Sequence, residues 1–134
     1  MAVDPVTHLL LAVGWTTSTP GNPSMWRWDG AVWRPVGGRT PPSVPGLVLD
    51  PASNRLLSWS SPDKVGSRRQ TWSWSGNAWN ARASTQLPGF GEVDITGVVG
   101  GHVLLLGWLA DVTQGAPQPI HIWAWTGSVW ARRA

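Results

Sequence analysis

The chain has 134 residues and no Cys, so disulfide scaffolds, thiolate metal sites and cysteine nucleophiles are excluded. Ten Lys or Arg against seven Asp or Glu give a net charge of +3, and 13% charged with 42% apolar residues excludes a solvated, disordered chain. One domain is expected at this length, and 16 Gly with 12 Pro favour many short strands and tight turns over a helical bundle.

Three internal repeats fill the chain from end to end. Each contains two Trp separated by one residue and a third Trp five positions further on. This pattern occurs at Trp26, Trp28 and Trp33, at Trp72, Trp74 and Trp79, and at Trp123, Trp125 and Trp130. The shift of 46 positions between the first two copies also carries Asp4-Pro5 onto Asp50-Pro51 and Leu10-Leu11 onto Leu56-Leu57. Nine of the 12 Trp therefore report a repeated structural unit.

Each repeat is predicted to form four short strands. The first is apolar, as at 46–49 and 93–99, and ends in a turn at 50–54 or 100–101. The second is a leucine run, which in the third copy is Leu104 to Leu106. A longer segment rich in Gly, Pro and Ser follows, at 16–24, 60–67 and 111–119. The third and fourth strands form a hairpin that contains the three Trp.

The hairpin turns set the predicted pairing of these Trp. Asp29-Gly30 predicts a two-residue type I′ turn, and the Ser-Gly and Thr-Gly pairs of the later copies are weaker signals of the same kind. Counting outward from such turns places three Trp pairs directly opposite each other: Trp26 and Trp33, Trp72 and Trp79, and Trp123 and Trp130. The two-residue period places all three Trp of a hairpin on one face.

The other face of each hairpin is expected to carry smaller residues, at least in copies two and three. Its predicted pairs are Arg27 with Val32, Ser73 with Ala78, and Ala124 with Val129. A bulky face and a small face suit sheets stacked face to face. We therefore expect the Trp face of one sheet to pack on the small face of the next.

A repeat of about 40–50 residues with four strands is typical of a β-propeller blade. The hairpin from Trp26 to Trp33 resembles the end of a bacterial kelch-like propeller repeat, and this resemblance covers the whole chain. Where kelch repeats close the second strand with paired glycines, this chain has Gly14-Trp15, Trp59-Ser60 and Gly107-Trp108. An extracellular location is what the resemblance implies, although the start of the chain shows no secretion signal.

The segment from Trp28 to Trp33 also resembles six-bladed fucose-binding lectins, which share a Trp-Asp-Gly-x-x-Trp hairpin. Those lectins use an Arg and Glu pair at each sugar site. Glu92 is the single Glu of this chain, so fucose sites of that kind do not recur here.

The expected fold class is all-β: three four-stranded antiparallel blades of a β-propeller, at 1–45, 46–91 and 92–134. Propellers close with four to eight blades, so a three-blade stack would expose apolar faces at both ends. Two copies joined head to tail would close a six-bladed ring with two equivalent seams, and we expect this homodimer. The alternatives are missing blades from a longer gene or a different protein, or an open stack capped by a larger complex.

No catalytic activity is expected. A galactose-oxidase-type kelch enzyme needs a Tyr–Cys cofactor and a sialidase needs a tyrosine nucleophile, and the chain has neither Tyr nor Cys. His8 and His102 stand at matching places before the second strand, so a repeated turn position explains them better than a metal site. The carboxylates that could form a glycoside-hydrolysing pair are interpreted as loop and turn residues: Asp63, Glu92, Asp94 and Asp111. We expect neither a metal nor another cofactor.

Binding is the remaining function. Propeller ligands usually meet the loops at one end of the ring, so the long segments after the second strands are the candidate sites. They offer six residues: Trp15, Asp63, Arg68, Arg69, Trp108 and Asp111. Trp15 and Trp108 are platforms for sugar rings or core residues, and Arg68-Arg69 anchors an acidic partner or lies at a solvated loop tip.

The favoured function is a non-enzymatic propeller module or structural subunit that binds a protein partner. The alternative is a lectin with sugar sites between blades or on the loop face. Despite a pI near 11.1, the basic residues are dispersed, so no nucleic-acid partner is expected. No stretch approaches the ~20 apolar residues of a membrane span.

Overall fold

The computed structural model describes residues 1–14, 24–37, 46–59, 70–82, 90–109 and 119–133, with only the backbone described at 90–95 and 108–109. These residues form twelve β-strands and no helix. None of the described segments is therefore an apolar helix of the length that crosses a membrane.

The strands form three four-stranded sheets, in each of which every strand pairs antiparallel with its neighbour in the chain. The first sheet contains β1 (Ala2–Val3), β2 (Leu10–Gly14), β3 (Ser24–Trp28) and β4 (Trp33–Pro35). The second contains β5 (Val48–Asp50), β6 (Arg55–Trp59), β7 (Thr71–Trp74) and β8 (Trp79–Ala81). The third contains β9 (Phe90–Val99), β10 (His102–Leu109), β11 (His121–Trp125) and β12 (Trp130–Arg132). The predicted all-β repeat of four strands is confirmed, and β9 is longer than the expected 93–99.

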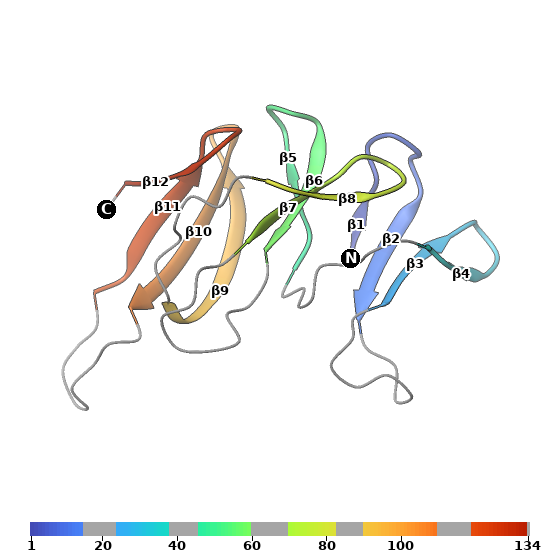
Figure 1. Cartoon of the computed structure of the whole chain (residues 1–134), viewed down its shortest axis with the longest axis horizontal. Coiled ribbons are helices and arrows are strands. Elements are labelled where there is room, and N and C mark those ends of the chain that lie inside the picture. The colour runs from blue at the N-terminus through green and yellow to red at the C-terminus, as the bar shows by residue number, and fades with distance from the viewer. Residues whose placement is uncertain (15–23, 38–45, 60–69, 83–89, 110–118, 134) are drawn as a thin grey trace.

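The three sheets stand side by side in chain order, with the second in the middle (Figure 1). We call the side of each sheet that carries its three hairpin Trp the Trp face, and the opposite side the reverse face. Side chains alternate along a strand, and directly paired residues share a face. Leu11, Leu57 and Leu104 pair with Arg27, Ser73 and Ala124, so these three leucines lie on reverse faces at equivalent positions.

Two hydrophobic cores fill the spaces between the sheets. The first contains Leu11 and Met25 of the first sheet together with four residues of the second: Leu56, Trp72, Trp74 and Trp79. The second contains Leu57 and Trp59 of the second sheet together with four residues of the third: Val103, Leu105, Trp125 and Trp130. In both cores a Trp face packs on the reverse face of the preceding sheet. The predicted stacking of a Trp face on the opposite face of a neighbouring sheet is confirmed, but the neighbour is the preceding sheet and not the next, and its face carries large residues such as Met25 and Trp59.

We call the interface between the first and second sheets the first seam, and the interface between the second and third sheets the second seam. Indole N–H groups add hydrogen bonds across both seams. Trp74 Nε1 donates to Asp4 Oδ2 over 3.1 Å, and Trp79 Nε1 donates to Met25 Sδ over 3.2 Å. In the second seam Trp130 Nε1 donates to Thr71 Oγ1 over 2.9 Å. Trp79 and Trp130 are equivalent, as are their acceptor residues, so both seams use the same pair of positions. These bonds fix how each sheet sits on the one before it.

The predicted Trp pairing is wrong by two residues. Three pairs lie directly opposite each other, with ring centroids 5.5, 5.4 and 5.3 Å apart: Trp28 and Trp33, Trp74 and Trp79, and Trp125 and Trp130. Each hairpin therefore has a four-residue loop in place of a two-residue turn. A shift of two leaves every side chain on its own face, so the three Trp still share one.

The same shift changes the partners on the reverse face. The observed pairs are Arg27 with Arg34, Ser73 with Asn80, and Ala124 with Ala131, in place of the predicted Val32, Ala78 and Val129. A type I′ turn needs positive φ at two successive residues. Gly30 has a φ of 101°, but Asp29 is not among the positive-φ residues. The predicted turn type is therefore wrong.

The turn before the second strand of each sheet places one residue in the left-handed backbone region. His8 and Asn54, 46 positions apart, have φ values of 57° and 51°, and Gly101 (φ 79°) stands at the equivalent place in the third copy. The third turn is short, because Val99 pairs directly with His102. The predicted match of His8 with His102 is therefore one residue off, although His8 does occupy a repeated turn position.

Candidate functional site

The six sequence-predicted binding residues are not placed by the structure. Trp15, Asp63, Arg68, Arg69 and Asp111 lie outside the described residues. Trp108 belongs to β10, but its side chain is not described. The loop-face site therefore stays a prediction, and the described residues direct attention to the two ends of the stack.

The Trp face of the first sheet forms one end of the stack, and we call it the Trp end face. Its residues are Leu10, Ala12, Trp26, Trp28 and Trp33. In the second and third sheets the equivalents of Trp33 are only 7% and 5% exposed, whereas Trp33 is 42% exposed. Trp28 is half-buried, but its equivalent Trp74 is 3% exposed. The exposure differs because no other sheet formed by the described residues lies on that side (Figure 1).

The reverse face of the third sheet forms the other end, and we call it the reverse end face. Its residues are Val99, Leu104, Leu106, Ile122 and Ala124. Leu104 and Leu106 are half-buried, whereas their second-sheet equivalents, Leu57 and Trp59, are 1% and 2% exposed. Val99 is 63% exposed. Positions that form a closed core inside the chain are thus partly open at both ends.

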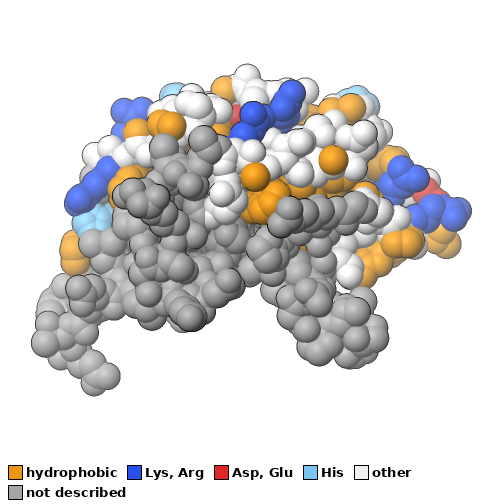
Figure 2. Space-filling view, viewed as in Figure 1, with side chains coloured by type: hydrophobic (Ala, Val, Ile, Leu, Met, Phe, Trp, Pro, Cys, Tyr) orange, Lys and Arg blue, Asp and Glu red, His pale blue; other side chains and the backbone are white. Residues whose placement is uncertain are grey.

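Neither end face, as defined by these residues, contains an Asp, Glu, Lys or Arg. Covering these residues would bury no charge, although the exposed Arg133 lies opposite Ile122 at the edge of the reverse end face. Figure 2 shows hydrophobic side chains at the β3–β4 end of the molecule, with basic side chains close by. An uncharged sheet face rimmed by polar groups is typical of an interaction surface.

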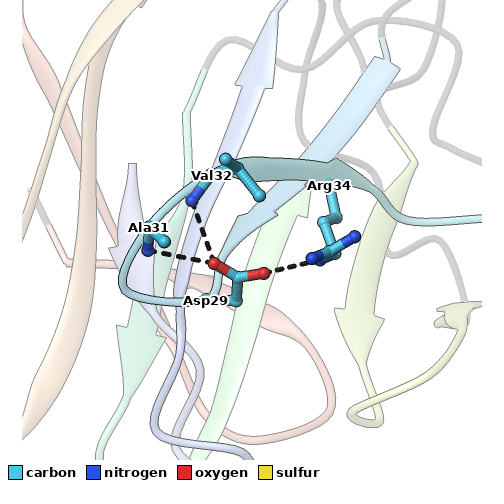
Figure 3. A network of polar contacts seen from close by, with 4 residues as sticks. All are labelled: Asp29, Ala31, Val32 and Arg34. Atoms are coloured by element: carbon cyan, nitrogen blue, oxygen red, sulfur yellow. Dashed lines mark hydrogen bonds and ion pairs between the residues drawn. The ribbon is translucent and has the colours of Figure 1, made fainter.

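A carboxylate network fixes the hairpin that presents Trp28 and Trp33 (Figure 3). Asp29 Oδ1 accepts the backbone N–H groups of Ala31 and Val32, at 3.0 and 2.9 Å. Asp29 Oδ2 accepts Arg34 Nε at 2.5 Å. The hydrogen bond from Val32, followed by those from Arg34 and Ala31, lowers the pKa of Asp29 to about 2. The carboxylate stays ionised at neutral pH and holds the wider loop, which explains why no type I′ turn forms.

Equivalent polar residues hold the other two hairpins. Thr126 Oγ1 accepts the backbone N–H of Val129 at 3.2 Å, as Asp29 accepts that of Val32. Ser75 Oγ donates to the carbonyl of Ala78 over 3.0 Å. The sequence signal for this position is an Asp, Ser or Thr directly after the second Trp of each repeat. Its role in a four-residue loop was missed because Asp-Gly is also the strongest signal for a two-residue turn.

A buried carboxylate stabilises the first seam. Asp4 is 1% exposed and accepts the backbone N–H of Val6, the hydroxyl of Thr7 and the indole N–H of Trp74. Burial raises the pKa of Asp4, but these hydrogen bonds lower it more, so the pKa is lowered overall. The repeated Asp-Pro dipeptide was the sequence signal for this turn, but it did not reveal the bond to Trp74.

Two buried nitrogen atoms in the second seam have no hydrogen-bond partner within the described part of the chain: Trp59 Nε1 and His121 Nε2. His121 Nδ1 lies 2.7 Å from a terminal nitrogen of Arg132. A guanidinium carries only donors, so Nδ1 is the acceptor and the hydrogen of the neutral ring lies on Nε2. Both unpartnered atoms are thus N–H donors. They belong to the last residue pairs before the long segments that follow β6 and β10.

The described residues hold no group of three His, Asp or Glu side chains in an arrangement suited to a metal ion. No protein-family model matches the chain, and comparisons with curated proteins and with solved structures also give no match. The two end faces are therefore the candidate functional surfaces of the described residues.

Proposed function

We propose that the chain is a non-enzymatic structural module: three blades of a β-propeller whose two end faces bind further sheets of a protein partner. The observation that carries this proposal is the difference in exposure at equivalent positions. Trp33 is 42% exposed, whereas Trp79 and Trp130 are 7% and 5% exposed under a neighbouring sheet. The end faces are the same two sides of the repeat that form the internal seams, but no sheet of the described residues covers them.

The internal seams support the proposal because they show what these surfaces do when they are covered. Twice within one chain, a Trp face of this sequence pattern packs on a reverse face and forms a closed core. The mechanism would be shape and apolar complementarity on a rigid frame, in which the paired Trp rings hold each hairpin. A shape-based module of this kind needs no reacting group.

The proposal is tested with the purified chain and a dye that fluoresces on exposed apolar surface. A chain that remains a 14.5 kDa monomer should bind the dye, and Trp33→Glu should reduce the signal. A chain that assembles should show a higher mass by light scattering and little dye binding. Ala78→Glu, at an exposed hairpin position of the middle sheet, is the control and should change neither result. A stable monomer that binds no dye would refute the proposal.

A second candidate function is carbohydrate binding, with Trp108 in the sequence-predicted role of a platform for a sugar ring, because indole rings pack well against sugar rings. A glycan array of the native assembly tests it. Sharp binding that Trp108→Ala abolishes, and that Trp79→Phe in the first seam leaves intact, would support a lectin. Silence across the array would reject it.

A further inference from the structure

We infer that the sheet covering the Trp end face is the reverse end face of a second copy of this chain, in a head-to-tail seam. This inference rests on the proposed function, because it names the partner that the end faces bind. A seam of this type joins two different surfaces. The copies at the two ends of an open assembly therefore each keep one free face, until the assembly closes into a ring.

The chain already contains two seams of this kind. Both join a Trp face to a reverse face, and neither joins two faces of the same type. A third seam built in the same way needs one free Trp face and one free reverse face. The first sheet supplies the former and the third sheet the latter (Figure 1). One chain thus carries both halves of its own interface.

The internal seams also predict the register of the new seam. The fourth-strand Trp lies over the residue directly before the first hairpin Trp of the preceding sheet: Trp79 over Met25, and Trp130 over Thr71. In the new seam Trp33 therefore lies over Ile122 of the second copy. In the first seam Trp74 lies over Asp4. Trp28 is the equivalent of Trp74 and Val99 stands at the position of Asp4, so in the new seam Trp28 lies over Val99 of the second copy.

The new seam differs from the internal ones in polarity. The acceptor positions that hold Asp4, Met25 and Thr71 in the chain are occupied by Val99 and Ile122 in the third sheet. The seam between copies is thus apolar and lacks the indole hydrogen bonds of the internal seams. We therefore expect it to separate before the internal seams do, which makes assembly reversible and dependent on concentration.

Six sheets lie within the four to eight that a closed propeller contains, so two copies suffice to close the ring with two equivalent seams. The expected mass in solution is twice 14.5 kDa. An open head-to-tail arrangement would instead grow without limit, and its mass would rise continuously with concentration. The mass at two concentrations separates these two forms of the same seam.

A complementation experiment tests the polarity of the seam. Trp33→Arg blocks the Trp end face and Leu106→Arg blocks the reverse end face, so each variant alone should be a monomer. Mixing them one to one should restore a two-chain complex, because each contributes the face that the other lacks. Ala78→Arg is the matched control and should remain a dimer. Far-UV circular dichroism of each variant confirms that it is folded.

The alternatives give different patterns. If two Trp end faces met each other, Leu106→Arg would stay dimeric and mixing would change nothing. If two reverse end faces met, Trp33→Arg would stay dimeric. Either pattern overturns the inference. A wild-type monomer that binds the apolar dye would overturn it as well but leave the proposed function standing, whereas a monomer that binds no dye would remove both.

Cross-linking tests the register. The natural chain has no Cys, so each introduced thiol is unique. A mixture of Trp33→Cys and Ile122→Cys chains, treated with a bifunctional maleimide, should give a cross-linked pair that contains one chain of each kind. Trp33→Cys mixed with Ala78→Cys is the control and should give none. Links between two Trp33→Cys chains in place of the mixed pair would contradict the head-to-tail register.

Discussion

Removing the fourth-strand Trp from each sheet in turn provides a direct test of how the three sheets differ. Trp33, Trp79 and Trp130 occupy one position of the repeat but are 42%, 7% and 5% exposed. Replacing a buried Trp by Ala typically costs about 3–5 kcal/mol. We expect Trp79→Ala and Trp130→Ala to lie in that range, since each leaves a cavity in a seam. Trp33→Ala should cost the dilute monomer about 2 kcal/mol, because little more than half of the ring is buried.

Trp33 should also contribute to the free energy of association between copies, because assembly covers the part of its side chain that the monomer exposes. A Trp buries roughly 150–250 Å² when it is fully covered, so the exposed part of Trp33 corresponds to about 100 Å² at most. At about 25 cal/mol per Å², covering it contributes about 2 kcal/mol to each seam, or roughly a 30-fold change in Kd. Trp33→Ala should therefore weaken association by about this factor for each seam.

The measurement is urea unfolding of the three variants, followed by circular dichroism at a protein concentration where light scattering shows a monomer. Association is then measured at higher concentration for wild type and Trp33→Ala. Equal destabilisation by all three substitutions in the dilute monomer would refute the reasoning, because it would mean that the Trp end face is already covered within one chain. Unchanged association of Trp33→Ala would refute its place in the seam.

Three further predictions concern single contacts. A double-mutant cycle with Trp130→Phe and Thr71→Val should give a coupling energy of about 1 kcal/mol in urea unfolding, since their buried hydrogen bond measures 2.9 Å; zero coupling would contradict the bond. Asp29→Asn should lower Tm at pH 7, and the difference from wild type should fade as pH drops from about 4 to 2. The lowered pKa of Asp29 means that its stabilisation is present above the unfolded pKa and is lost as pH falls through the folded one; a constant difference would oppose this. Gly76→Ala should lower stability more than Gly30→Ala. Both glycines have positive φ, but only at Gly76 would a β-carbon meet another side-chain atom, at 3.3 Å, and equal losses of Tm would contradict this.

The sequence predicted the repeat and the faces because both follow from local periodicity. The shift of 46 positions aligned Trp26 with Trp72, and side chains that alternate along a strand placed the Trp of a hairpin together. The pairing of Trp28 with Trp33 could not be read in the same way. Asp29-Gly30 is compatible with two loop lengths, and the hydrogen bonds of the Asp29 carboxylate decided between them.

The third repeat shows where spacing was insufficient. Three consecutive leucines, Leu104 to Leu106, allowed more than one alignment with the Leu10-Leu11 pair. Pairing of Leu104 with Ala124 places Leu104 and Leu106 on the reverse face and leaves Leu105 in the core. The composition of the reverse end face therefore depended on the register of one strand pair.

The sequence by itself determined an all-β chain of three four-stranded repeats, each with one Trp-rich face, because hydrophobic alternation and turn residues act within a few positions. Only the tertiary structure decided which faces meet and which stay open. That choice depends on contacts such as Trp130 with Thr71, which join residues far apart in the chain. The Trp of one repeat position therefore differ in environment: Trp79 and Trp130 are covered by a neighbouring sheet, whereas Trp33 lies at the end of the stack, where no sheet of the described residues covers it.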